Sequence, residues 1–211
     1  EKCNIPHKRG LGSSASAIAA SLKIADFLSQ SDLPLNELLR MGTELEGHPD
    51  NIIPCLLGGL VVSYYDDKKV DFEKFNIENF ELSFIIPEIE MQTEKMRKSL
   101  PKKVDFDDAI FNIKNGLQFL SKISKHKYDE AFKYTSDRLH QKYRIETSGE
   151  MKKLINKVEN DKRIDFWFLS GSGSIICFKS KKQLNFEEAH IITKKIYNKP
   201  IKILSINNKE E

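Results

Sequence analysis

The stretch that most restricts the fold of this 211-residue chain is PHKRGLGSSAS at residues 6–16, which runs directly into an apolar-periodic segment. Glycines let the backbone turn tightly and approach a ligand closely. From residue 15 to residue 28 the apolar positions recur with helical spacing. A helix N-terminus offers unpaired N–H groups and the positive end of a dipole, both of which suit phosphate. The sequence therefore predicts a glycine loop that opens a helix and can receive an anion.

Two common phosphate motifs do not describe this loop. No Lys-Ser or Lys-Thr pair follows the second glycine, as a Walker A loop would need, and the spacing is not GxGxxG. Taken alone, the loop could equally be a serine-capped start of an ordinary helix.

A second polar cluster, ELEGHPDN, occupies residues 44–51. It follows a predicted helix at 35–46, which Gly47 and Pro49 should end, and we expect Asp50 to cap a short helix reaching residue 57. Magnesium prefers hard oxygen ligands and usually takes only one or two carboxylates. The cluster is therefore a candidate metal or substrate site, with helix capping and a solvated turn as the alternative.

A third motif, SGSGS at 170–174, lies between two predicted strands at 166–169 and 175–178. The N–H groups of such a turn can line a phosphate, although a plain hairpin turn has the same composition.

The remaining pattern predicts a mixed α+β chain. Strands are expected at 60–65, 82–86 and 201–206, and helices at 107–124, 128–140, 148–160 and 186–197. Residues 66–80 look like a polar connection and a domain boundary. This order favours an antiparallel α+β sandwich over a Rossmann sheet.

Composition excludes several classes of function. The net charge is only +3, with acidic and basic residues mixed, so we expect no nucleic-acid partner. No apolar run approaches the ~20 residues of a membrane helix. Three distant cysteines indicate reduced thiols, a cytoplasmic location and no zinc site. The missing initiator Met and the abrupt start suggest part of a longer protein.

The three motifs, in this order, resemble the GHMP small-molecule kinases over most of the chain. EGHPDN, followed by Pro54 and the pair Gly58-Gly59, is similar to the branch that acts on L-homoserine. The resemblance implies a two-lobed α+β fold. A partial ribosomal-protein-like first lobe would occupy residues 1–75, and a ferredoxin-like second lobe residues 76–211.

The same resemblance implies transfer of the γ-phosphoryl group of ATP, with Mg²⁺, to the side-chain hydroxyl of L-homoserine in threonine biosynthesis. The partner would be this small molecule, with no nucleic acid and no membrane, and a homodimer is left open. The family carries a further stretch ahead of the glycine loop, so the chain alone should be inactive. Alternatives are a kinase for mevalonate, a sugar or an isoprenoid alcohol, and a non-catalytic nucleotide-binding or interaction module.

Residue roles follow by motif match. The nucleotide would contact Pro6, His7, Lys8, Arg9, Gly10, Leu11, Gly12, Ser13, Ser14, Ala15, Ser16, Gly171 and Gly173. The metal ligands would be Ser14, with Ser13 as second choice, and Glu46, with Glu44 as its rival. The substrate would contact His48, Asp50, Asn51 and Arg144, with Arg138 as the alternative arginine.

Asp50 and Asn51 are the catalytic candidates, and Asp50 is either a general base or a substrate ligand. The chain departs from the family in two places. No arginine follows Arg163, so Lys194 or Lys195 would replace a second arginine, or that contact is absent. Ser174-Ile175 stands where relatives often have a proline after SGSG or SGAG.

Overall fold

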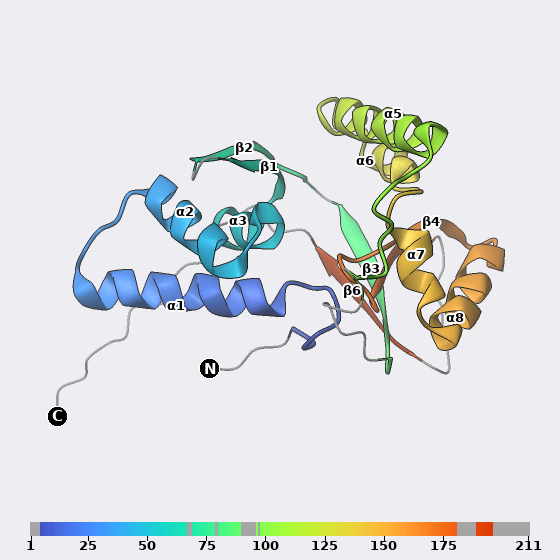
Figure 1. Cartoon of the computed structure of the whole chain (residues 1–211), viewed down its shortest axis with the longest axis horizontal. Helices are drawn as coiled ribbons and strands as arrows, with labels where there is room; N and C mark the ends of the chain where they lie inside the picture. The colour runs from blue at the N-terminus through green and yellow to red at the C-terminus, as the bar shows by residue number, and fades with distance from the viewer. Residues whose placement is uncertain are drawn as a thin grey trace. The chain divides into compact units, whose positions relative to one another are not determined.

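The computed structural model describes residues 5–66, 69–78, 80–89, 96, 98–180 and 189–195. The chain divides into two compact units (Figure 1). Residues 12–76 form the first, called here the helical unit. Residues 5–11 and the described part of 77–195 form the second, called the sheet unit. The glycine loop therefore passes from one unit to the other between Leu11 and Gly12.

The helical unit consists of three helices and a hairpin. The helices are α1 (Ser13–Ser29), α2 (Leu35–Glu46) and α3 (Pro49–Leu57), and the hairpin pairs β1 (Leu60–Asp66) with β2 (Lys69–Phe75). Figure 1 shows α1 running beside α2 and α3. Their shared core contains Ala15, Ala19, Leu39, Ile52, Ile53, Leu56 and Leu57.

Small residues let these helices pack closely. Ala15 and Ala19 on α1 have no exposed surface. At Gly42 on α2, an added Cβ would come within 2.7 Å of Ile52 Cγ1 on α3. Because core packing is dense, even one methyl group there would force α2 and α3 apart.

The sheet unit is built on a four-stranded antiparallel sheet. The strand order is β4 (Ile164–Leu169), β5 (Ile176–Ser180), β3 (Glu81–Pro87) and β6 (Ala189–Lys195). The helices of this unit are α5 (Phe106–Ile123), α6 (Tyr128–Ala131), the 3-10 turn η1 (Phe132–Tyr134), α7 (Gln141–Glu146) and α8 (Gly149–Asn160).

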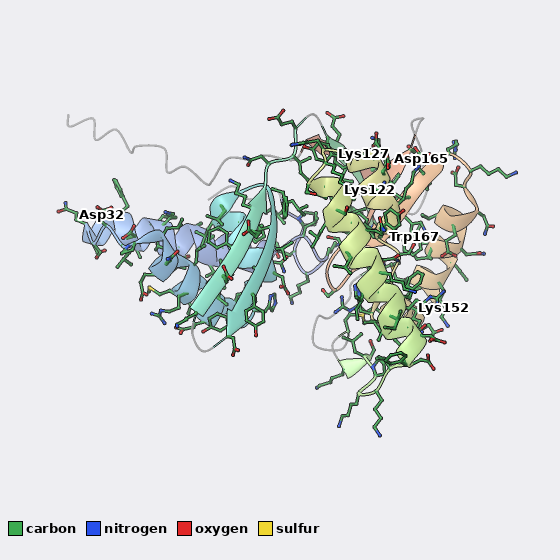
Figure 2. All side chains as sticks on the ribbon, turned by 90° about the horizontal axis from the view of Figure 1, so that it is seen from above. Asp32, Lys122, Lys127, Lys152, Asp165 and Trp167 are labelled. Carbon is green, nitrogen blue, oxygen red and sulfur yellow. The ribbon has the colours of Figure 1, made fainter. Side chains whose placement is uncertain are left out.

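The core of the sheet unit forms between α8 and the sheet. The apolar face of α8 carries Met151, Leu154, Ile155 and Val158, which cluster with Ile85, Ile176 and Phe178 of the strands. Trp167 on β4 packs against this core from a half-buried position (Figure 2). The amphipathic spacing of α8 thus explains why the helix covers the sheet.

Most of the predicted elements are confirmed, and the chain is a mixed α+β protein. The helices expected near 15–28, 35–46, 107–124 and 148–160 and the strands near 60–65, 82–86, 166–169 and 175–178 are present within a few residues. The strand expected at 201–206 lies outside the described residues. Among the described residues, Cys55 and Cys177 are not paired in a disulfide.

Four predictions about local structure were wrong. Residues 66–80 contain β2, whose alternating exposure marks a half-buried strand. The helix expected at 128–140 ends early, because the Asp137 carboxylate accepts the N–H groups of Leu139 and His140 and restarts the chain as α7. Asp50 does not cap α3; His48 occupies the cap position, and Pro49 begins the helix.

The fourth error concerns residues 186–197, where the expected helix is replaced by β6 over residues 189–195. This strand pairs with β3 along its whole length, from Ala189 opposite Pro87 to Lys195 opposite Glu81. The β-branched run Ile191, Ile192 and Thr193 favours a strand once a partner edge is present.

Among the described residues, no helix is long and apolar enough to cross a membrane.

Candidate functional site

The first turn of α1 has no cap from the protein. Gly12 stands at the cap position with φ 68°, no side chain accepts from the first amides, and the first turn holds no acidic residue. The first internal bond runs from Ser16 N–H to the Gly12 carbonyl at 2.9 Å. The N–H groups of Ser13, Ser14 and Ala15 therefore find no acceptor in the described part of the chain. Three free donors at a positive dipole end form an anion-binding arrangement.

The end of α2 meets this turn. Ser14 Oγ donates a hydrogen bond of 2.8 Å to Glu46 Oε2. Glu46 is the last residue of α2, and Gly47, with φ 83°, ends the helix by donating to the Thr43 carbonyl at 2.8 Å. A hydroxyl and a carboxylate oxygen thus lie side by side at the uncapped turn of α1.

Glu44, the rival metal ligand, is engaged elsewhere. Arg40 Nη1 donates to Glu44 Oε1 at 2.6 Å, and the Tyr65 hydroxyl donates to the same oxygen at 3.4 Å. Arg40 also binds Glu37. Partial burial raises the pKa of Tyr65, and the charge of Glu44 and the hydrogen bond to it raise this pKa further. The geometry therefore favours Glu46 over Glu44 as the carboxylate beside Ser14.

The EGHPDN bend also contacts the glycine loop. An added Cβ at Gly12 would lie 3.6 Å from Asn51 Cβ, so the Asn51 side chain packs beside this glycine. His48 Nδ1 is buried and has no hydrogen-bond partner among the described residues; Asp50 Oδ2 lies 3.9 Å away. The Asp50 side chain is 75% exposed. The helical unit thus gathers the second half of the glycine loop and the EGHPDN cluster around the first turn of α1.

The first half of the loop is bound to the third motif within the sheet unit. Ser170 Oγ donates to the Gly10 carbonyl at 2.7 Å, and Ile175 N–H donates to the Arg9 carbonyl at 3.2 Å. An added Cβ at Gly10, where φ is 88°, would come within 2.1 Å of the Ser170 carbonyl oxygen. The Arg9 guanidinium donates to the Pro87 carbonyl. His7 and Lys8 are exposed.

The amides of the 170–174 turn are partly used by the turn itself. Gly173 N–H donates to the Ser170 carbonyl at 2.9 Å, and Ser170 N–H donates to the Ile175 carbonyl at 2.9 Å. The Gly173 amide is therefore already bonded. This turn supports the backbone at Gly10 more directly than it offers donors to an anion.

Arg144 belongs to the sheet unit, whereas the other substrate candidates belong to the helical unit. Its Nη1 donates to the Gly171 carbonyl at 2.5 Å and lies 3.5 Å from His140 Nδ1. Arg138, the alternative arginine, stacks over the Phe111 ring at 3.9 Å and pairs with Asp108 at 3.5 Å. Arg138 therefore serves the packing of α5.

Sequence reasoning missed Gln141. This glutamine is 6% exposed, and its Oε1 accepts the Leu169 N–H at 2.6 Å. Its Nε2 donates to the Thr135 carbonyl at 3.0 Å. The sequence offered one signal, a glutamine one helical turn before Arg144, but an amide in a polar stretch does not show that it will be buried.

The donor set fits magnesium better than a softer metal. No group of three or more His, Cys, Asp or Glu side chains that could hold a metal occurs among the described residues. Ser14 and Glu46 supply hard oxygens, and Mg²⁺ commonly binds one or two protein oxygens together with phosphates and water. Burial raises the pKa of the Cys177 thiol to about 12, which disfavours the thiolate that nucleophilic attack and metal binding require.

Comparison with known proteins identifies a matching family model and several relatives of this chain. Residues 2–59 match the family model for the GHMP kinases N terminal domain. This segment is therefore a GHMP kinase N-terminal domain by sequence. Relatives of the chain include the homoserine kinase of Thermotoga petrophila, which is 49% identical over 84% of this chain and 62% of that protein. The homoserine kinase of Caldicellulosiruptor bescii is 37% identical over 87% of this chain and 60% of that protein.

Solved structures of other proteins share the fold of this chain. The crystal structure of homoserine kinase from Cytophaga hutchinsonii matches with a TM-score of 0.79 at 22% identity, over 93% of this chain and 69% of that one. Mevalonate diphosphate decarboxylase from Staphylococcus aureus matches with a TM-score of 0.62 at 12% identity, over 92% of this chain and 67% of that one. The chain spans about three fifths of the length of the curated relatives named above.

We expect Gly10→Ala to lower the unfolding free energy by about 3 kcal/mol, since it adds a left-handed non-glycine residue and a backbone overlap. Gly149→Ala is the matched control, because a Cβ there meets nothing within 4 Å; its effect should be below about 1 kcal/mol. Urea titration followed by circular dichroism measures both. Equal midpoints for the two variants would contradict the close packing at Gly10.

Proposed function

We propose that the complete protein containing this chain phosphorylates the side-chain hydroxyl of L-homoserine with ATP, in threonine biosynthesis in the cytoplasm. The observation that carries this proposal is the Ser14–Glu46 hydrogen bond at the uncapped start of α1. It supports a phosphate site and a magnesium site at one point. The names of the relatives support homoserine as the acceptor.

The triphosphate would bind the free N–H groups of Ser13, Ser14 and Ala15. Phosphoryl transfer asks chiefly for positioning and for neutralised charge, and the dipole of the 17-residue α1 contributes to both. Gly10 and Gly12 let the backbone pass close to the phosphates. Lys8 and Arg9 add positive charge in the same loop, although Arg9 is also bonded to the Pro87 carbonyl.

Ser14 and Glu46 would hold Mg²⁺. The ion, when bound, neutralises charge on the phosphates. Ser14 supplies a hydroxyl oxygen and Glu46 a carboxylate oxygen, already 2.8 Å apart through their shared hydrogen bond. Binding an ion requires the Ser14 hydroxyl to turn its proton away from Glu46, a rotation about a single bond.

The amino-acid substrate would be held by His48, Asp50 and Asn51, with Arg144 as the ligand of its carboxylate. Arginine suits this task because its planar fork matches a carboxylate. Asp50, exposed at the start of α3, either accepts the hydroxyl proton as a general base or fixes the substrate while the proton passes to phosphate. Asn51, packed beside Gly12, would orient the acceptor near the phosphate loop.

The proposal is tested by an ADP-release assay on the complete reading frame that contains this chain, with Mg-ATP and a panel of alcohols. We expect turnover with L-homoserine and at least about 100-fold lower kcat/KM with mevalonate or a sugar, since a site that hydrogen-bonds the groups of an amino acid rejects acceptors that lack them. Preference for another alcohol would overturn the assignment of L-homoserine as the substrate. Absence of Mg-ATP binding by calorimetry would instead support a non-catalytic interaction module.

Glu46→Gln should lower kcat/KM by about 100-fold and raise the Mg²⁺ concentration needed for half-maximal rate, because it removes a charged metal ligand. The variant keeps an oxygen that can accept from Ser14. Glu44→Gln is the matched control two residues away and should stay within about threefold. Initial rates across a magnesium titration measure both variants. A larger loss in the Glu44 variant would reverse the assignment.

Asp50→Asn separates the two roles of that carboxylate. General-base catalysis contributes about 10²–10⁴-fold, so a loss of that size in kcat with little change in KM would assign a base. A loss confined mostly to the KM for homoserine would assign a binding role. Steady-state kinetics with homoserine as the varied substrate distinguish these outcomes. Unchanged kinetics would remove Asp50 from the site.

A further inference from the structure

The first part of the glycine loop is bound to the 170–174 turn, which has no assigned part in the proposed reaction. Residues 9 and 10 rest on the 170–174 turn through the Ser170 Oγ to Gly10 carbonyl bond and the Ile175 N–H to Arg9 carbonyl bond. The contact at Gly10 leaves no room for a side chain. Any movement of this turn would therefore move the backbone of the loop.

Two side chains of α7 hold the 170–174 turn. Gln141 Oε1 accepts the N–H of Leu169, the residue just before the turn, at 2.6 Å. Arg144 Nη1 donates to the carbonyl of Gly171, inside the turn, at 2.5 Å. The two side chains lie three residues apart on α7, so they project from the same face of the helix. Together they contact the turn on both sides of Ser170.

The start of α7 is itself fixed. The Asp137 carboxylate accepts N–H bonds from Leu139 at 3.0 Å, His140 at 2.9 Å and Gln141 at 2.5 Å. Burial would raise the pKa of Asp137, but these bonds, with one from Asn112, outweigh it and lower the pKa. Asp137 therefore stays charged near neutral pH and keeps the beginning of α7 in place.

We propose that Gln141 and Arg144 are positioning residues that hold the 170–174 turn against the Arg9–Gly10 backbone and so orient the loop proposed to bind the triphosphate. The link to the triphosphate rests on the proposed function. The contacts that hold the turn are independent of the proposed function. Arg144 would thus support nucleotide binding through the turn, either in addition to binding the substrate carboxylate or instead of it.

Two readouts on the complete protein test this, with Gln141→Ala and Arg144→Ala as variants. The first is hydrogen exchange in the peptide covering residues 170–176, which contains the Ile175 amide bonded to Arg9. Both variants should exchange there about tenfold faster, while α1 to α3 keep their protection, because loss of a buried or charge-assisted bond opens the structure locally. The second is the Kd for Mg-ADP without homoserine, expected to rise about tenfold.

Lys142→Ala is the matched control. Lys142 lies between the two residues on α7 but binds Asp108 of α5 at 2.6 Å, so the variant loses an ion pair without touching the turn. It should leave both readouts unchanged. Arg144→Lys retains a donor and should restore part of the nucleotide affinity, which a general loss of folding would not do.

The outcomes are separable. Unchanged exchange at 170–176 in both alanine variants would overturn the proposal. Faster exchange with an unchanged Kd for Mg-ADP would overturn the link to the nucleotide. A rise only in the KM for homoserine in Arg144→Ala would assign this arginine to the substrate alone. Faster exchange in a protein that binds no Mg-ADP would support the hold on the turn while rejecting the proposed function.

Discussion

The hydrogen bond between Ser14 and Glu46 is where the sequence-distant parts of the helical unit meet. It requires the first turn of α1 to lie against the last residue of α2. That proximity comes from the packing of small residues, since Ala15 and Ala19 are fully buried and Gly42 lets α2 approach Ile52 of α3. The polar pair is therefore a consequence of the apolar core beneath it, and larger side chains in that core would separate the two oxygens.

The loop between the units depends on two different glycines. Gly10 is needed because the Ser170 carbonyl occupies the space of a side chain. Gly12 is needed for its left-handed φ of 68°, which starts α1 without a capping side chain. The surroundings of the two residues belong to different units, the 170–174 turn for Gly10 and Asn51 for Gly12. One short stretch of backbone is thus shaped by both parts of the chain.

Much of this site could be predicted from residue types, and the rest could not. The helices around the first two motifs follow from apolar spacing, and the candidates Ser14 and Glu46 follow from oxygen chemistry and the family resemblance. The preference for Glu46 over Glu44 as the proposed metal ligand depends on tertiary contacts, because Arg40 and Tyr65 engage Glu44. Gln141 and β6 were missed because a buried amide and a paired strand edge depend on tertiary partners that local pattern does not encode.

The charges around α1 argue for a cation at this point. An anion at the free amides would be attracted by the helix dipole, yet it would also lie near the Glu46 carboxylate, which is bonded to Ser14 of the same turn. Two like charges about 4 Å apart repel by about 1 kcal/mol in water and by about 4 kcal/mol near a protein surface. That repulsion would cancel the gain from the dipole, which is about 0.3–2 kcal/mol. A divalent ion between the carboxylate and the phosphate converts the repulsion into two attractions, so the carboxylate at an anion-binding turn is consistent with binding of the anion as its magnesium complex.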